Sequence, residues 1–506
     1  MRCPDSLAVK NGLKEKDKLL YKSIDWILHD TSYISWRDGD KLGLLWIRGG
    51  AGKGKTMMSI GLIEQLSLVH DDSTVITYFF CRNADVMLND IAAIVKGLIF
   101  RLVSQRVELK ECLRRRWDTE KQRFNEDMTP WRTLWHIFLE MLEQCKCKRL
   151  YIVVDALDEC QDEGMAEFLK LMVRTGLGHP SKVKWLLTSR PLDSFKHALS
   201  VGSDQELISL ELNSKHIAEA VRFYIAARAT ELDRLNNYGS ALRGQVEEQL
   251  IGKAEDTFLW VSLVCQRLES VPRKYALSTI QELPQGLSKF YHRILTQLSG
   301  GEPDAVKECM RLLKVMLVVY RPLRVVEVNS VMDLSTEESV IDALVRRCAP
   351  LVRRREMVVE FVHKSAQDYL VGKDGQSLLE AFGDYGHSEI TLSCLSCMSG
   401  RLKVNLLDLP QPASTPEWVK TLKDERRGAL LASLDYAATF WMQHLADAKQ
   451  SALIRKAITE PGKVSVFLRN SLLEWLECLS WLGQLHRALG TFKILQDAAE
   501  VSHGRI

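Results

Sequence analysis

The stretch LLWIRGGAGKGKTMMS, from Leu44 to Ser59, decides the fold of this 506-residue chain. Four apolar residues lead into a glycine-rich loop, and the segment TMMSIGLIEQLSLV, which starts inside the loop, is predicted to be a helix. The loop matches GxxxxGK[ST] at every fixed position, and a buried strand before it with a helix after it is the context of a phosphate-binding loop. The stretch therefore predicts a nucleotide-binding loop in an α/β domain; a flexible surface loop is the alternative.

The loop itself would supply most of the contacts to phosphate. Glycines let successive main-chain N–H groups point at an anion because no Cβ blocks the approach, and the N-terminus of the following helix favours negative charge. Lys55 is expected to reach the β- and γ-phosphates, and the Thr56 hydroxyl is expected to bind Mg²⁺. The residues predicted to bind the nucleotide here are Gly49, Gly50, Ala51, Gly52, Lys53, Gly54, Lys55 and Thr56.

A second part of the predicted site follows a later apolar strand in LYIVVDALDEC, residues 150–160. The carboxyl ends of parallel strands meet at the edge where ligands bind, so Asp155 is expected beside the phosphate loop, holding Mg²⁺ through water. Asp158 or Glu159 is placed to orient or deprotonate an attacking water. An exposed acidic turn is the alternative explanation of the same residues.

The next apolar strand, in LLTSRP, predicts a third group at the same edge. Arg190 follows this strand and is expected to contact the γ-phosphate, which would distinguish a triphosphate from a diphosphate; a surface arginine is the alternative. The sequence contains no NKxD motif, which would indicate guanine selectivity, so we predict ATP and ADP as the nucleotides.

Strands and helices alternate from about Gly43 to Leu212, which predicts a parallel sheet with helices on both faces. A helix over residues 13–29 should precede this domain, and helices in series should follow it. Near residues 322–370, short β-like pieces such as PLRVVEV mix with helices, the pattern of a winged-helix module. The predicted segments are an N-terminal flanking helix at 1–40, a P-loop NTPase domain at 41–213, a helical subdomain at 214–300, a winged-helix-like domain at 301–372 and a helical C-terminal region at 373–506.

Composition narrows the classes of partner. The chain has 68 Lys and Arg against 65 Asp and Glu, a net charge of +3, so no electrostatic footprint for nucleic acid is expected. Its longest apolar run, LLKVMLVVY, is shorter than the ~20 residues of a membrane-spanning helix. Twelve scattered cysteines and no secretory leader predict free thiols in a cytoplasmic protein.

Several segments, in this order, resemble the NACHT-type STAND ATPases of filamentous fungi. They include LLWIRGGAGKGKT, IVVDALDEC, LLTSRP, DTFLWVSLVCQRL and VVEFVHKSAQDYL. Members of this family are NOD-like receptors linked to heterokaryon incompatibility, programmed cell death and non-self recognition, a form of innate immunity. The resemblance implies a nucleotide-operated switch in which ADP holds a closed monomer and ATP permits an open homo-oligomer that engages a protein partner or effector.

The resemblance also implies roles for two further positions. His363 stands where related receptors have a histidine that touches the β-phosphate of ADP, although the aspartate that usually follows it is Lys364 here. Phe258 lies in DTFLW, where plant relatives have a proline beside the adenine. Family members typically add an N-terminal effector domain and C-terminal repeats, and we expect this chain to lack both.

These features predict a signal-transduction switch with slow ATP hydrolysis. Two other functions remain open at this point. One is an enzyme whose continuous ATP turnover drives remodelling work, and the other is a pseudo-NTPase scaffold that binds nucleotide only to fold.

Overall fold

A computed structural model describes most of the chain. The described residues are 5–16, 21–68, 73–85, 87–119, 130–160, 162–191, 206–211, 213–332, 338–409, 425–448, 452–459 and 461–485. The chain divides into two compact units, Met1–Phe290 and Tyr291–Ile506. The division falls inside helix α15 (Leu287–Ser299), and each unit is described by itself.

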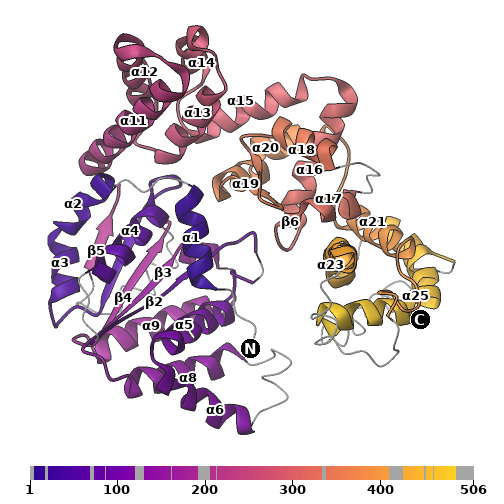
Figure 1. Cartoon of the computed structure of the whole chain (residues 1–506), viewed down its shortest axis with the longest axis horizontal. Coiled ribbons are helices and arrows are strands. Elements are labelled where there is room, and N and C mark those ends of the chain that lie inside the picture. The colour runs from indigo at the N-terminus through magenta and orange to yellow at the C-terminus, as the bar shows by residue number, and fades with distance from the viewer. Residues whose placement is uncertain are drawn as a thin grey trace. The chain divides into compact units, whose positions relative to one another are not determined.

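The first unit is built on a five-stranded sheet, which Figure 1 shows with its flanking helices. Its strands are β1 (Leu44–Arg48), β2 (Thr74–Phe80), β3 (Arg149–Asp155), β4 (Val183–Ser189) and β5 (Glu206–Ser209). All neighbouring pairs are parallel and the order is β2-β3-β4-β1-β5. Since β4 lies between β1 and β3, the strand before the phosphate loop and the strand that ends at Asp155 both border β4.

Helices cover both faces of the sheet, which confirms the predicted α/β class (Figure 1). One face carries α5 (Ile91–Gln105), α8 (Trp131–Gln144) and α9 (Met165–Gly178), and α6 (Lys110–Thr119) packs on α8. The other face carries α1 (Ser6–Lys16), α3 (Thr31–Asp38) and α4 (Lys55–Leu68). Strands covered on both sides are apolar throughout, as in β3, where Leu150 to Val154 are all buried.

The prediction of one continuous helix over residues 13–29 is wrong. Helix α1 ends within this segment, a 3₁₀ turn follows at Tyr21–Ser23, and α2 spans Asp25–Leu28. The Ser23 hydroxyl donates to the carbonyl of Ala220 over 3.4 Å. A tertiary contact of this kind fixes the turn, and the hydrophobic period alone does not reveal it.

A group of helices completes the first unit. They are α11 (Ser214–Asn236), α12 (Gly239–Lys253), α13 (Phe258–Glu269) and α14 (Ala276–Glu282). This confirms that alternation stops after residue 213, as predicted from the sequence.

The second unit begins with the element order of a winged-helix module. Its elements are α16 (Pro303–Val318), β6 (Leu323–Arg324), α17 (Val325–Met332), α18 (Glu338–Arg347), β7 (Val352–Arg355) and β8 (Val358–Phe361). The three strands form an antiparallel sheet in the order β6-β8-β7. The helices that follow are α19 (Lys364–Val371), α20 (Lys373–Glu380), α21 (His387–Ser399), α23 (Glu425–Asp447), α24 (Ala452–Ile458) and α25 (Lys463–Leu482).

Most of the segment PLRVVEV is helical, although its β-branched residues predicted a strand. Only Leu323–Arg324 pairs in the sheet, and α17 begins at Val325. The buried carboxylate of Glu327 accepts from the main-chain N–H of Arg324 over 2.7 Å and pairs with Arg321 over 2.7 Å. This capping contact starts the helix and overrides the local preference of the valines.

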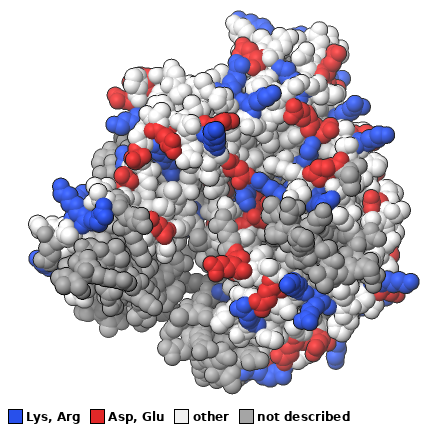
Figure 2. Space-filling view, turned by 180° about the vertical axis from the view of Figure 1, so that it is seen from behind, with Lys and Arg blue, Asp and Glu red and all other residues white. Residues whose placement is uncertain are grey.

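Charged side chains of both signs are interspersed on the face that Figure 2 shows. The described residues contain no helix that is both long enough and apolar enough to span a bilayer.

Candidate nucleotide-binding site

The loop between β1 and α4 has the shape that its glycines allow. Gly52 and Gly54 have φ angles of +72° and +84°, in the left-handed region that other residues rarely adopt. A Cβ on Gly52 would lie 2.8 Å from Cγ2 of Thr257, and one on Gly54 would lie 3.1 Å from the ring of Phe258. The loop therefore needs glycine at both positions, for its backbone and for the close approach of residues 257–258.

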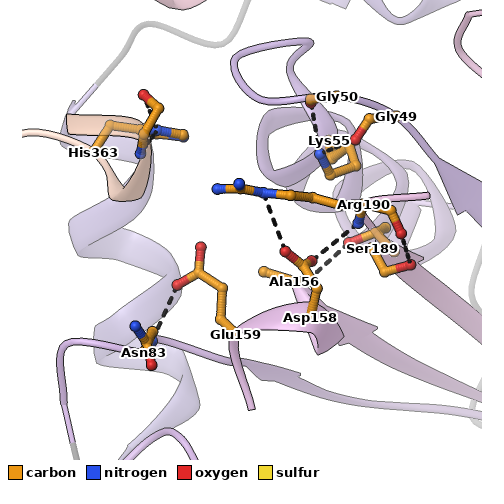
Figure 3. Close-up of polar contacts among 12 residues, drawn as sticks. Gly49, Gly50, Lys55, Asn83, Ala156, Asp158, Glu159, Ser189, Arg190 and His363 are labelled. Atoms are coloured by element: carbon orange, nitrogen blue, oxygen red, sulfur yellow. Dashed lines mark hydrogen bonds and ion pairs between the residues drawn. The ribbon is translucent and has the colours of Figure 1, made fainter. Parts of the chain in front are cut away.

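Lys55 begins α4 and folds back over the loop (Figure 3). Its ammonium donates to the carbonyls of Gly49 (2.5 Å) and Gly50 (2.8 Å). Burial lowers the pKa of Lys55, while the carboxylates of Asp158 and Asp155 act in the opposite direction. The cation is thus held at the loop, at the place where the sequence motif predicts contact with phosphate.

Asp155 ends β3 and is 1% exposed. Its Oδ2 accepts from the hydroxyl of Thr56 (2.7 Å), and its Oδ1 accepts from the hydroxyls of Ser59 (2.7 Å) and Thr188 (2.7 Å). Burial raises the pKa of the Asp155 carboxyl, and the three hydroxyl bonds and the Lys55 charge oppose this rise. The structure therefore brings together Thr56 and Asp155, the two residues predicted to serve Mg²⁺.

The oxygen atoms of Thr56 and Asp155 fit a magnesium ion, because Mg²⁺ prefers hard oxygen ligands and is usually held by one or two protein groups together with water and phosphate. Ser59 and Thr188 were not predicted. The sequence indicates both residues only weakly. Ser59 follows Thr56 by three positions, so the two side chains share one face of a helix. Thr188 lies in LLTSRP, directly before the last residue of β4.

The three predicted catalytic residues lie at the same sheet edge, around a sharp turn after Asp155 (Figure 3). Ala156 has a φ of 53°, and its N–H donates to the Thr188 hydroxyl over 2.9 Å. Asp158 accepts from the main-chain N–H of Arg190 (3.1 Å) and pairs with the Arg190 guanidinium (3.3 Å). Glu159 accepts from the main-chain N–H of Asn83 over 3.1 Å. Two of the three predicted catalytic residues therefore form one ion pair.

The helices of the first unit also contact the loop. The Lys53 ammonium donates to the carbonyls of Glu255 and Asp256, both over 3.0 Å, just beyond the end of α12. Carbonyls at a helix C-terminus attract cations. The side chain of Lys53 is thus bound to the helical part of the unit, which leaves its main-chain N–H as the group for the predicted nucleotide contact.

His363 belongs to the second unit and is the N-cap of α19. Its backbone is extended, and its Nδ1 accepts from the N–H of Ser365 over 3.0 Å. An Nδ1 that accepts this bond places the proton of the neutral ring on Nε2.

Comparison with known proteins finds one matching family and one fungal relative. The family described as "Nephrocystin 3, N-terminal" matches residues 22–190, which include the loop, the acidic turn and Arg190. The vegetative incompatibility protein HET-E-1 of Podospora anserina is 30% identical over 502 residues, which is 95% of this chain and 36% of that protein. The chain is thus similar to a fungal vegetative incompatibility protein along nearly its whole length. The chain spans about a third of the length of that relative.

Solved structures give weaker likenesses. A Walker-type ATPase of Pyrococcus abyssi matches with a TM-score of 0.34 and 11% identity, over 71% of the present chain and 95% of that ATPase chain. The Aeropyrum pernix ORC2 protein, solved as ADPNP–ADP complexes, matches with a TM-score of 0.35 and 11% identity, over 75% and 96% of the two chains. Both likenesses are too weak to bear on function.

Proposed function

We propose that this chain is a nucleotide-operated signalling switch of the NACHT type that binds ADP and ATP, hydrolyses ATP slowly, and acts in fungal non-self recognition or programmed cell death. One observation carries the proposal: Thr56 Oγ1 lies 2.7 Å from Asp155 Oδ2, so the end of the phosphate loop meets the acidic end of β3. A P-loop NTPase holds its magnesium–nucleotide complex between these two groups. The likeness to an incompatibility protein supports the biological role.

In this proposal the loop main chain from Gly49 to Thr56 and the Lys55 ammonium bind the phosphates. The Thr56 hydroxyl and the Asp155 carboxylate would hold Mg²⁺, which when bound neutralises phosphate charge. Arg190, held in position by Asp158, would contact the γ-phosphate.

Slow hydrolysis follows from the contacts of the two candidate bases. Asp158 accepts from the backbone of Arg190 and pairs with its guanidinium, and Glu159 accepts from Asn83. Carboxylate oxygens that already accept hydrogen bonds have fewer lone pairs with which to take a proton from water. Because Asp158 pairs with the Arg190 guanidinium, we assign the role of orienting or deprotonating the attacking water to Glu159.

For His363 the proposal rests on the family resemblance. The Nδ1 bond to Ser365 supports it, because the proton on Nε2 makes that nitrogen a donor of the kind a phosphate oxygen accepts. His363 would then favour the ADP state.

Titration calorimetry with Mg–ADP and with a non-hydrolysable ATP analogue tests the proposal. Lys55→Ala should weaken both affinities by at least about a hundredfold, because it removes a buried charge-assisted contact to phosphate. Lys148→Ala, at an exposed lysine before β3, is the control and should change neither affinity. Equal affinities for wild type and Lys55→Ala would overturn the assignment of the loop.

The two alternative functions, a remodelling ATPase and a scaffold, predict results that differ from those of a switch. A remodelling ATPase would show sustained turnover of about 1–100 s⁻¹, the range of working phosphoryl-transfer enzymes. A scaffold that needs nucleotide only to fold would lose thermal stability when nucleotide is removed, but its oligomeric state would not respond to ADP or to the ATP analogue.

A further inference from the structure

Glu211 is bound to the phosphate loop. Strand β5 ends at Ser209, and the turn after it brings the Glu211 carboxylate to the main-chain N–H of Gly50, which donates to Oε1 over 2.6 Å. The other carboxylate oxygen accepts from the Ser209 hydroxyl over 3.2 Å. One main-chain donor of the loop is therefore occupied by an anion that belongs to the chain itself.

Contacts that do not involve the carboxylate fix this turn against the loop. The N–H of Leu210 donates to the carbonyl of Arg48 over 2.9 Å. The buried Leu210 side chain lies so close to Gly49 that a Cβ there would be 2.7 Å from Cδ1. Asn213 Nδ2 donates to the carbonyl of Ser209 over 2.9 Å. The backbone of Glu211 is thus held beside the loop, while its exposed side chain has room to turn away.

Two opposite charges act on the peptide groups of Gly50. The Glu211 carboxylate accepts from its N–H, and the Lys55 ammonium donates to its carbonyl over 2.8 Å. The charge of Glu211 also reaches Lys55, where it partly offsets the burial that lowers the Lys55 pKa. A phosphate oxygen that approached the Gly50 amide would have to displace a carboxylate of the same sign.

We propose that Glu211 is a specificity-determining residue that competes with phosphate at the loop and biases the site toward ADP over ATP. The inference rests on the proposed nucleotide site. Repulsion between like charges grows with the charge of the ligand, and a triphosphate brings one more negative charge than a diphosphate into the same site. Glu211 would therefore raise the free energy of the ATP-bound state more than that of the ADP-bound state.

Glu211→Gln tests the idea, because it removes the charge and keeps both the volume and an oxygen acceptor for Gly50. The dissociation constants of Mg–ADP and of a Mg-bound non-hydrolysable ATP analogue are measured for wild type and variant by calorimetry. We expect the variant to bind the ATP analogue roughly three- to tenfold more tightly than wild type and ADP by a smaller factor. Glu143→Gln, at an exposed glutamate of α8, is the matched control and should leave the ratio unchanged.

The effect should also depend on salt. At about 1 M salt the Debye length falls to about 3 Å, so the difference between wild type and Glu211→Gln should shrink. Glu211→Ala, which removes charge and acceptor together, is the second variant should Glu211→Gln fail to fold, and it should shift the ADP-to-ATP ratio in the same direction.

The outcomes separate the two proposals. If wild type binds nucleotide, Lys55→Ala does not, and Glu211→Gln keeps the wild-type ratio within about twofold, only the role of Glu211 is overturned. If wild type, Glu211→Gln and Glu211→Ala all bind neither nucleotide, the nucleotide site and the role of Glu211 fall together. If the Glu211 variants bind nucleotide and wild type does not, the result would support competition between the Glu211 carboxylate and phosphate.

Discussion

Glu159 is the residue on which hydrolysis should depend most directly. Its carboxylate lies at the turn after β3 and accepts from the N–H of Asn83, whereas Asp158 also holds Arg190. Glu159→Gln should slow ATP hydrolysis by about 10²–10⁴-fold, the usual contribution of a general base, while the affinity for ADP stays within about twofold. Single-turnover phosphate release measures the rate, and calorimetry measures the affinity.

The control for this prediction is Glu163→Gln, at an exposed glutamate four positions further along the chain. An unchanged rate in Glu159→Gln would remove Glu159 from the chemistry. Loss of nucleotide binding would instead mean that this carboxylate serves the metal. Asp158→Asn is a poorer test because it would also release the Arg190 guanidinium.

At the residue scale, the sequence predicted where the main groups lie but not what they contact. The loop motif and the strand ending in Asp155 placed Thr56 and Asp155 at one edge, and the structure brings them to 2.7 Å. The ion pair between Asp158 and Arg190 was not predictable in the same way, because it needs β3 and β4 to be neighbours, and chain order does not determine strand order. No sequence motif indicated that Glu211 would contact the loop.

Helices α21 and α23 of the second unit carry a histidine pair, of which His444 is buried and His387 is half-buried. His387 Nδ1 and His444 Nδ1 lie 2.8 Å apart, and His444 Nε2 bonds to the Tyr436 hydroxyl over 2.9 Å. Burial lowers the pKa of His444 to about 3, and burial also lowers the pKa of His387, partly offset by the charge of Asp447. His444 therefore remains neutral in the folded unit at pH values where a free histidine is protonated.

The histidine pair predicts that acid destabilises this unit. Below about pH 6.5 the unfolded chain binds a proton at His444 that the folded unit does not bind until about pH 3, so the free energy of unfolding falls as the pH drops through this window. The loss should reach roughly 3–5 kcal/mol by the lower end of the window. Urea unfolding followed by tryptophan fluorescence at pH 7.5 and pH 5 measures the first part of it.

His444→Gln should reduce this pH dependence, since the group that titrates on unfolding is gone. His136→Gln, at an exposed histidine of α8 in the first unit, should not change it. Equal slopes for wild type and His444→Gln would show that other groups cause the acid sensitivity.

At the element scale, the sequence was reliable for elements whose pattern is local and long. The strand before the phosphate loop and the helix after it are found as predicted. Helix α17 was missed because its start depends on the capping carboxylate of Glu327, which contacts Arg321 and Arg324. The turn at Tyr21–Ser23 was missed because Ser23 contacts Ala220, which is distant in the sequence. Short segments of this kind follow tertiary packing more than propensity.

For the whole molecule, the proposed switch predicts a change of size with nucleotide. The protein should purify with bound ADP and behave as a monomer, and it should form larger species after exchange into the non-hydrolysable ATP analogue. Liquid chromatography of the released nucleotide identifies the ligand, and light scattering measures the mass. The same mass in both nucleotides would contradict the switch and favour a scaffold.

His363→Ala belongs to the same experiment. If His363 favours the ADP state, the variant should lose ADP faster than wild type and form the larger species at lower concentrations of the ATP analogue. His179→Ala, at the C-cap of α9 in the first unit, is the control and should behave as wild type. Retention of ADP as tight as in wild type would remove the role that the family resemblance implies.

The position of β4 in the sheet has a consequence for how the site can be altered. Thr188 of β4 bonds to Asp155, and two residues later Arg190 pairs with Asp158. The proposed cation-binding side of the site and its proposed γ-phosphate side thus both depend on the carboxyl end of one strand. A small shift of that strand end would disturb both sides at once. We therefore expect that mutations at the end of β4 change the affinity for metal and the preference for a triphosphate together.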